Sequence, residues 1–228
     1  MALDEALLRA DPIIPTLRTY AWNPWTLSLG YFQQVDPEVI ATVREEGFGV
    51  VRRPTGGGAI FHGPELTYAV ICPLGEPGFP RDVEGAYHVV HGILSAALGE
   101  LGTPAEVRGN RTLVSDSGNS GEFWCFYEST SFDLVVGDRK LVGSAQRRTG
   151  RGFLMHGSIP LAPNHFTPET ATAEASYEEL EEALARAATA TLGSRMIPGV
   201  PTPGELARSH DLVRSRYRTE EWNFKRSP

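Results

Sequence analysis

Apolar side chains recur at helical spacing in several stretches of this 228-residue chain. Residues 2–10 carry a short amphipathic stripe that ends in an Asp-Pro pair. A second helix is predicted to begin at Asp36 and Pro37, its cap and first residue, and to run to about Glu46. The longest stripe covers residues 81–102, and its single apolar face predicts a helix that packs across a sheet.

Two more helices are predicted towards the end of the chain. Ser176, with Glu179 three positions later, has the pattern of a capping box in front of residues 177–193. A Pro- and Gly-rich link, residues 197–205, then leads into a charged helix that runs to about Trp222.

Apolar runs of strand length lie between these helices. TLRTYAW and TLSLGYFQ alternate on either side of Asn23 and Pro24, which predicts a hairpin with its turn at that pair. A Ser-, Gly- and Asn-rich stretch, residues 106–123, predicts a mobile surface loop, and the three strands after it are expected to form a second antiparallel set. The strands of this second set cover residues 132–136, 140–148 and 152–161. Three further strands are predicted over residues 50–53, 59–62 and 66–73.

Strands and helices are therefore mixed without regular βαβ alternation, and the chain has no internal repeat. This order predicts an α+β fold, with mixed, mostly antiparallel sheets packed against helices. The length suits a single domain over residues 1–228, with a C-terminal helical segment at about residues 203–222.

Charge and composition exclude several classes of partner and site for this protein. A formal charge of -7 and a pI near 5.4 make nucleic acid an unexpected partner. No apolar run reaches the length of a membrane span, and the N-terminus carries acids where a signal peptide carries basic residues, so we expect a cytoplasmic protein without a membrane partner. Cys72 and Cys125 are too few for a disulfide framework, and their spacing suggests no metal site.

The stretch VRRPTGGGAIFHG, residues 51–63, places three glycines between two predicted strands. Phosphate-binding glycine loops precede a helix and have other spacings, so these nucleotide-binding patterns are excluded. Bare backbone beside Arg52, Arg53 and His62 suits the approach of a carboxylate or phosphoryl group. A β-bulge or hairpin corner is the alternative.

Cys125 and Lys140 are candidates for acyl chemistry. An ammonium near a thiol favours the reactive thiolate and can polarise an acyl carbonyl. The alternatives are a buried cysteine that serves only in packing and a solvated lysine at a sheet edge. Cys72, at the end of an apolar strand, fits the packing interpretation better, and His156 is interpreted as a hydrogen-bonded residue of the sheet.

Together these segments resemble the lipoate-protein ligase and octanoyltransferase family, which shares its fold with the catalytic domain of biotin-protein ligase. The resemblance covers nearly the whole chain, through MALDEALL, TYAWNPWTLSLGYFQ, VRRPTGGGAIFHGPELTYAVI, DRKLVGSAQRR and HGSIPL. In this family the glycine loop lines a tunnel for a medium-chain acyl group, and the lysine meets its carbonyl end. The biotin-ligase loop GRGRxGRxW is absent, which disfavours biotin. The resemblance implies catalytic roles for Cys125 and Lys140 and substrate-binding roles for Arg53, Gly56, Gly57, Gly58, His62, Gly143 and Ser144.

The family contains two chemistries. Octanoyltransferases take octanoyl from acyl carrier protein onto a cysteine as a thioester and pass it to a lysine of a lipoyl domain, such as glycine cleavage H protein or a dehydrogenase E2 subunit. They need no cofactor. Ligases activate free lipoate with ATP and Mg²⁺ through an acyl-adenylate, and some of them use a separate accessory protein.

The sequence carries features of both chemistries. CFYESTSFDLVVGDRK resembles the cysteine-bearing segment of the transferases, whereas the uncharged glycine loop resembles that of the ligases. The ligase element Arg-Asn-Asp is replaced by Ser131-Phe132-Asp133, so Asp133 alone could approach a metal. We favour transfer of octanoyl, or of lipoyl, over ligation. A relative that only binds lipoyl groups is the third alternative.

Family members generally have a strand before the helix that here starts at Met1. The resemblance therefore implies a native start upstream or a truncated chain. Loss of that strand would leave a sheet edge open to pairing with other chains.

Overall fold

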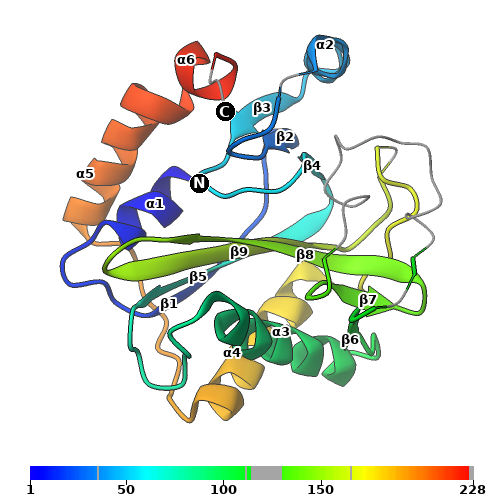
Figure 1. The fold of residues 1–228 in the computed structure, drawn as a ribbon, viewed down its shortest axis with the longest axis vertical. Helices are drawn as coiled ribbons and strands as arrows, with labels where there is room; N and C mark the ends of the chain where they lie inside the picture. The colour runs from blue at the N-terminus through cyan, green and yellow to red at the C-terminus, as the bar shows by residue number, and fades with distance from the viewer. Residues whose placement is uncertain (35, 111, 114–129, 165, 226–228) are drawn as a thin grey trace.

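A computed structural model describes residues 1–34, 36–110, 112–113, 130–164 and 166–225. Two sheets and the helices around them make up this structure (Figure 1). The part of the predicted mobile loop from residue 114 onwards, and Cys125 within it, lies outside the described residues.

The large sheet has six strands, in the order β1-β5-β9-β8-β7-β6. Every neighbouring pair in it is antiparallel. Strands β5 and β9, the second and third in this order, are buried along nearly their whole length. The strands are β1 (Thr16–Tyr20), β5 (Glu65–Pro73), β6 (Glu106–Val107), β7 (Leu134–Val136), β8 (Arg139–Arg148) and β9 (Gly152–Pro160).

The small sheet consists of β2 (Thr26–Leu29), β3 (Gly49–Arg52) and β4 (Ile60–His62), in the order β3-β2-β4. Strand β2 is parallel to β3 and antiparallel to β4. The glycine loop joins β3 to β4, so it belongs to this sheet. Helix α2 (Pro37–Glu45) makes the crossover from β2 to β3, and Asp36 caps it as predicted.

Helices α3 (Val83–Glu100) and α4 (Tyr177–Leu192) cover one face of the large sheet (Figure 1). Their apolar faces meet the side chains of β5 and β9 in the largest core cluster. The predicted capping box of α4 is present, with Ser176 and Glu179 bonded to each other's backbone. Helix α1 (Ala2–Leu8) and the small sheet lie on the opposite face (Figure 1).

The C-terminal segment folds against α1. Helix α5 (Pro203–Leu212) continues into a π-helical turn, η2 (Val213–Tyr217), and a short helix α6 (Glu220–Asn223) follows. The single charged helix predicted here is therefore three pieces. None of the helices among the described residues is long and apolar enough to cross a bilayer.

Two predictions about strand pairing are wrong. The residues around Asn23 and Pro24 do not form a hairpin, because β1 pairs with β5 in the large sheet while β2 pairs with β3 and β4 in the small one. The strands β7, β8 and β9 do not form a separate set either, since β9 pairs with β5 along its full length. Part of the predicted loop also forms a strand, because β6 (Glu106–Val107) pairs with β7. In the two pairing errors the strands themselves are found where the local pattern places them, and the error concerns their long-range partners.

Candidate functional site

Of the two buried arginines before the glycine loop, Arg53 binds the backbone of the loop itself. The Arg53 guanidinium donates to the carbonyls of Gly56 and Gly58, at 2.6 and 2.7 Å from its Nη2, and to that of Ser28 at 3.0 Å. Arg52 likewise donates to backbone carbonyls, among them Gly30 and Gln33. The observed bonds fix the loop's backbone, and the acyl contact implied for Arg53 stays a prediction.

Two of the glycines around this loop are needed for the conformation of the backbone. Gly57 has φ of +86°, in the left-handed region that side chains disfavour. Its carbonyl oxygen would lie 1.7 Å from a Cβ placed on Gly30, so the loop folds tightly onto the end of β2. By contrast, a Cβ on Gly56 would meet nothing within 4 Å. The backbone conformation therefore favours glycine at position 57, whereas position 56 has room for a side chain.

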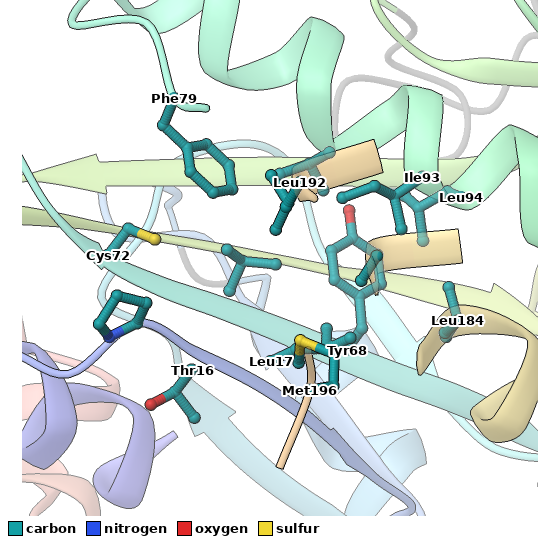
Figure 2. A pocket seen from close by; sticks show the side chains of 14 residues that line it. Thr16, Leu17, Tyr68, Cys72, Phe79, Ile93, Leu94, Leu184, Leu192 and Met196 are labelled. Carbon is teal, nitrogen blue, oxygen red and sulfur yellow. The ribbon is translucent and has the colours of Figure 1, made fainter. Parts of the chain in front are cut away.

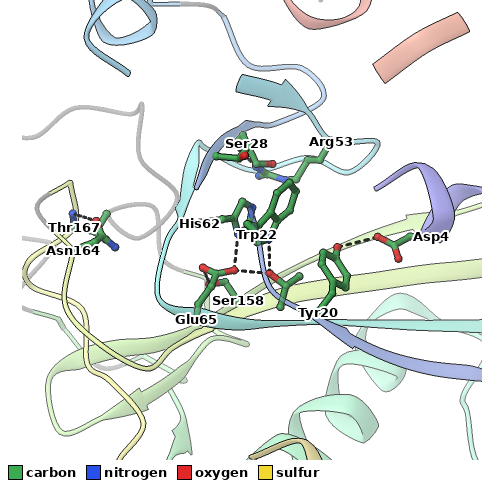
Figure 3. A network of polar contacts seen from close by, with 12 residues as sticks. Asp4, Tyr20, Trp22, Ser28, Arg53, His62, Glu65, Ser158, Asn164 and Thr167 are labelled. Carbon is green, nitrogen blue, oxygen red and sulfur yellow. Dashed lines mark hydrogen bonds and ion pairs between the residues drawn. The ribbon is translucent and has the colours of Figure 1, made fainter. Parts of the chain in front are cut away.

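His62, at the end of β4, belongs to a buried polar network (Figure 3). Its Nδ1 lies 2.7 Å from Oε1 of Glu65, and its ring stacks on Trp22 with centroids 4.3 Å apart. Thr67 and Ser158 also donate to the Glu65 carboxylate. Because that carboxylate accepts, His62 Nδ1 donates to it.

His62 also lines a small cavity between the two sheets. Within the described part of the chain, His62 Nε2 and His156 Nδ1 are buried and have no hydrogen-bond partner. Burial lowers the pKa of His156 to about 3, so its ring is neutral near pH 7. The cavity has a volume of about 20 Å³, enough for about one water molecule. Its lining comprises Met1, Tyr20, Arg53, Ile60, His62, Thr67, Ser144, Ala145, His156 and Gly157.

The structure thus brings Arg53, His62 and Ser144 together around one cavity, although the sequence separates them by up to 91 positions. The interpretation of His156 as a bonded sheet residue holds for one nitrogen, since its Nε2 lies 2.6 Å from the Thr55 hydroxyl. Gly143 pairs with Ser158 in the sheet and is not part of the lining.

Ser144 also lies within a directed chain of hydrogen bonds that runs from Tyr68 to the Phe132 carbonyl. His91, on α3, has its Nδ1 beside the carbonyl of Phe132, which can only accept. His91 Nε2 is therefore the acceptor for the Ser144 hydroxyl, 2.7 Å away, and the Tyr68 hydroxyl must donate to Ser144. Burial lowers the pKa of His91 to about 4, against the opposing effect of the Phe132 carbonyl, so the neutral ring persists near pH 7.

Lys140 is buried and lies in an ion pair. Its Nζ is 2.9 Å from Oδ2 of Asp133, and each of the two side chains is 3% exposed. The alternative of a solvated edge lysine is therefore wrong. Asp133, the residue that a ligase would direct to a metal, is engaged by Lys140 and by the backbone N–H of Thr130. Within the described ranges no three His, Cys, Asp or Glu side chains gather as metal ligands would.

A larger cavity, of about 60 Å³, lies on the opposite face of the large sheet beneath α3 and α4 (Figure 2). Leu17, Tyr68, Ile93 and Leu184 are among its walls, and no predicted site residue in the described part of the chain lines it. Cys72 faces this cavity and is buried, which confirms its packing role. Burial raises the pKa of its thiol to about 12, so it is a poor nucleophile.

Several site residues were not found from the sequence. Glu65 lies in the short turn between the predicted strands 59–62 and 66–73, and Trp22 and Thr67 lie within predicted strands. The pattern His-x-x-Glu across that turn was the available signal, since it places a carboxylate near the imidazole. His91 lies on the predicted apolar face of its helix, where a histidine between hydrophobic neighbours is the corresponding signal.

The fold is that of the lipoate-protein ligase catalytic domain. Lipoate-protein ligase A bound with ATP superposes with a TM-score of 0.80 at 24% identity, over 97% of this chain and 91% of that one. A bi-partite lipoate protein ligase from Thermoplasma acidophilum, described with its E2 lipoyl domain, gives 0.73 at 24% identity, over 97% and 89%. At such identities these neighbours establish the fold alone.

The chain belongs to the lipoyl protein ligase A/B catalytic domain family, whose model matches residues 1–200. Octanoyltransferase LipM of Geobacillus kaustophilus is 36% identical and aligns over 99% of this chain and 93% of its own length. The resemblance and the fold class predicted from the sequence are confirmed.

Proposed function

We propose that the protein transfers an octanoyl group from acyl carrier protein, through a thioester on Cys125, to a lysine of a lipoyl domain. The full-length similarity to an octanoyltransferase supports transfer over ligation. Glycine cleavage H protein and dehydrogenase E2 subunits are the acceptor classes that we expect. No nucleotide is required, because an amide is more stable than the thioester from which it forms.

The observation that carries this proposal is the buried Lys140. It occupies the second position of β8, the strand that also brings Ser144 to the cavity. A buried ammonium is an electrostatic group suited to a developing oxyanion. A lysine that served only for solubility would instead be exposed.

The reaction would proceed in two displacements. The Cys125 thiolate attacks the thioester carbonyl of the octanoyl-carrier, the carrier thiol leaves, and the acyl group is held as a new thioester. The acceptor amine then attacks that thioester, loses a proton and expels the cysteine thiol as the amide forms. Lys140 would stabilise the oxyanion of each tetrahedral intermediate. Arg53 and the glycine loop would hold the acyl chain, for which the cavity beside His62 must widen.

The test is transfer without ATP. Octanoyl-carrier and an unmodified lipoyl domain are incubated with the protein, and intact mass is measured for all three. We expect an octanoylated lipoyl domain and an octanoyl adduct on the enzyme that Cys125→Ser abolishes.

Two outcomes would contradict the proposal. Product that requires ATP, Mg²⁺ and free lipoate, and that Cys125→Ser still forms, would establish a ligase. Tight lipoate binding without product under either condition would indicate a binding protein, or a ligase that needs an accessory subunit.

A further inference from the structure

The cavity beneath α3 and α4 has about three times the volume of the cavity at the candidate site, about 60 Å³ against about 20 Å³. Side chains converge on it from β1, β5, α3, α4 and the segment after α4 (Figure 2). Among them are Leu17, Tyr68, Ile93, Leu184 and Met196. A molecule that enters such a cavity leaves water and gains dispersion contacts with the walls, and for an apolar group both changes are favourable.

The polar groups in these walls are already bonded or are uncharged. The Tyr68 hydroxyl is bonded to Ser144, and the Thr16 hydroxyl donates to the carbonyl of Ile14 at 2.8 Å. Burial raises the pKa of the Cys72 thiol to about 12, so this group stays neutral. No charged side chain is among the lining residues in the described part of the chain. The walls therefore suit a hydrocarbon group, since a polar group buried there would lose its hydrogen bonds to water without replacing them.

One side of the cavity is formed by residues that solvent reaches. Thr16, Leu192 and Met196 are partly exposed, whereas the lining residues on β5 and α3 are buried. Two exposed apolar residues lie close to this rim in the chain, Ile14 at 59% exposed and Ile197 at 81%. The rim therefore gives a ligand an entrance from solvent and leaves its polar end in water.

We propose that this cavity binds the unbranched alkyl tail of a small amphiphile, with the polar head at the rim. A water-sized group needs about 10–15 Å³ of cavity volume, so about 60 Å³ holds about four to six of them. A methylene group is of similar size, which sets the buried tail at about four to six carbons. The inference does not rest on acyl transfer, because no residue described in this wall has a role in the reaction proposed above.

The experiment measures urea unfolding of the full chain at increasing concentrations of n-hexanol. A ligand that binds only the folded state multiplies the folded-to-unfolded ratio by one plus its concentration over Kd, so we expect a rise of about twofold when the concentration equals Kd. The diol of the same chain, with a hydroxyl at each end, is the matched ligand. It would bury a hydroxyl without a partner, so its Kd should be higher by about tenfold or more.

A substitution in α4 tests whether hexanol binds in this cavity. Ala188 is buried and lines it, so the larger side chain of Ala188→Leu would occupy the space that the tail needs. This variant should lose the stabilisation by hexanol. Ala190→Leu, at an exposed position of the same helix, is the control and should keep it.

Equal stabilisation of wild type and Ala188→Leu by hexanol would show that hexanol binds elsewhere, such as at the candidate site, and would overturn the inference. Equal stabilisation by the diol, or none by either ligand, would overturn it too. If Ala188→Leu does not fold, nuclear Overhauser effects between the hexanol methyl group and the ring of Phe79, which lines the cavity, decide in the wild type. Their presence supports binding in this cavity, and their absence contradicts it. None of these measurements involves transfer, so failure of the proposed function would leave them unaffected.

Discussion

Arg53 and Gly57 show how single residues set the backbone around the candidate site. The Arg53 guanidinium binds the loop's carbonyls, and Gly57 supplies the left-handed turn that brings them within reach. The sequence indicated the chemistry of this loop, because glycines beside arginines are visible locally. It could not show that the arginine bonds would go to the loop itself, since that depends on the position of β2.

Replacement of Gly57 by alanine should destabilise the fold by about 1–2 kcal/mol, the cost of left-handed backbone for a residue with a Cβ. Gly56→Ala is the matched control and should change the free energy of unfolding by less than about 0.5 kcal/mol, because nothing lies within 4 Å of its added carbon. Urea denaturation of both variants measures the difference. Equal losses would show that the positive φ of Gly57 is not maintained in solution.

At the scale of elements, helix α3 is linked to the strands of the large sheet by the hydrogen bonds of His91. The helix was predicted correctly from its apolar stripe, but its histidine contacts Ser144 on β8 and the Phe132 carbonyl beside β7. Ser144 and Phe132 lie 53 and 41 positions from His91 in the sequence. Local periodicity identifies an element and its buried face, and it carries no information on which distant strand the face meets.

His91 should make the protein sensitive to acid. Its pKa is about 4 in the folded protein and near 6.5 when unfolded, so the unfolded chain binds more protons between these values. Stability is therefore full above about pH 6.5 and falls as the pH drops towards 4. His91→Gln keeps a donor for Phe132 and an acceptor for Ser144 but does not titrate.

From pH 7 to pH 4.5, wild type should lose on the order of 2 kcal/mol more stability than His91→Gln. Urea titrations of both proteins at the two pH values measure this difference, and the effects of the other titrating groups cancel between them. Parallel losses would mean that His91 is already charged in the folded protein or is exposed to solvent.

At the scale of the whole molecule, the segment around Asn23, for which a hairpin was wrongly predicted, connects the two sheets. Because β1 and β2 enter different sheets, the segment between them crosses from one sheet to the other and carries Trp22 to the face of His62. Strand pattern and turn residues are the same for a hairpin and for such a crossover. The choice between them is made by partners elsewhere in the chain, such as β5, which one local pattern cannot indicate.

The two ends of the described chain are joined through one buried carboxylate. Glu5 of α1 accepts from Tyr217 Oη at 2.7 Å and from Arg216 at 2.6 Å, more than 200 positions away. Burial and the neighbouring Glu5 raise the pKa of Tyr217, so the phenol stays protonated and donates. The C-terminal pieces α5, η2 and α6, all of which lie beyond the family match at residue 200, therefore contribute to the stability of the family domain.

Tyr217→Phe tests this connection because it removes the donor and leaves Glu5 buried with one bond fewer. We expect a loss of about 1–3 kcal/mol in the free energy of unfolding, the cost of an unmet hydrogen bond to a buried charged group. Arg214→Gln, which breaks the exposed pair with Asp211, is the control and should cost less than about 1 kcal/mol. Denaturation followed separately by fluorescence and by circular dichroism should show a single transition for both variants. A separate early transition in Tyr217→Phe would instead show that the C-terminal helices unfold on their own, without lowering the stability of the sheets.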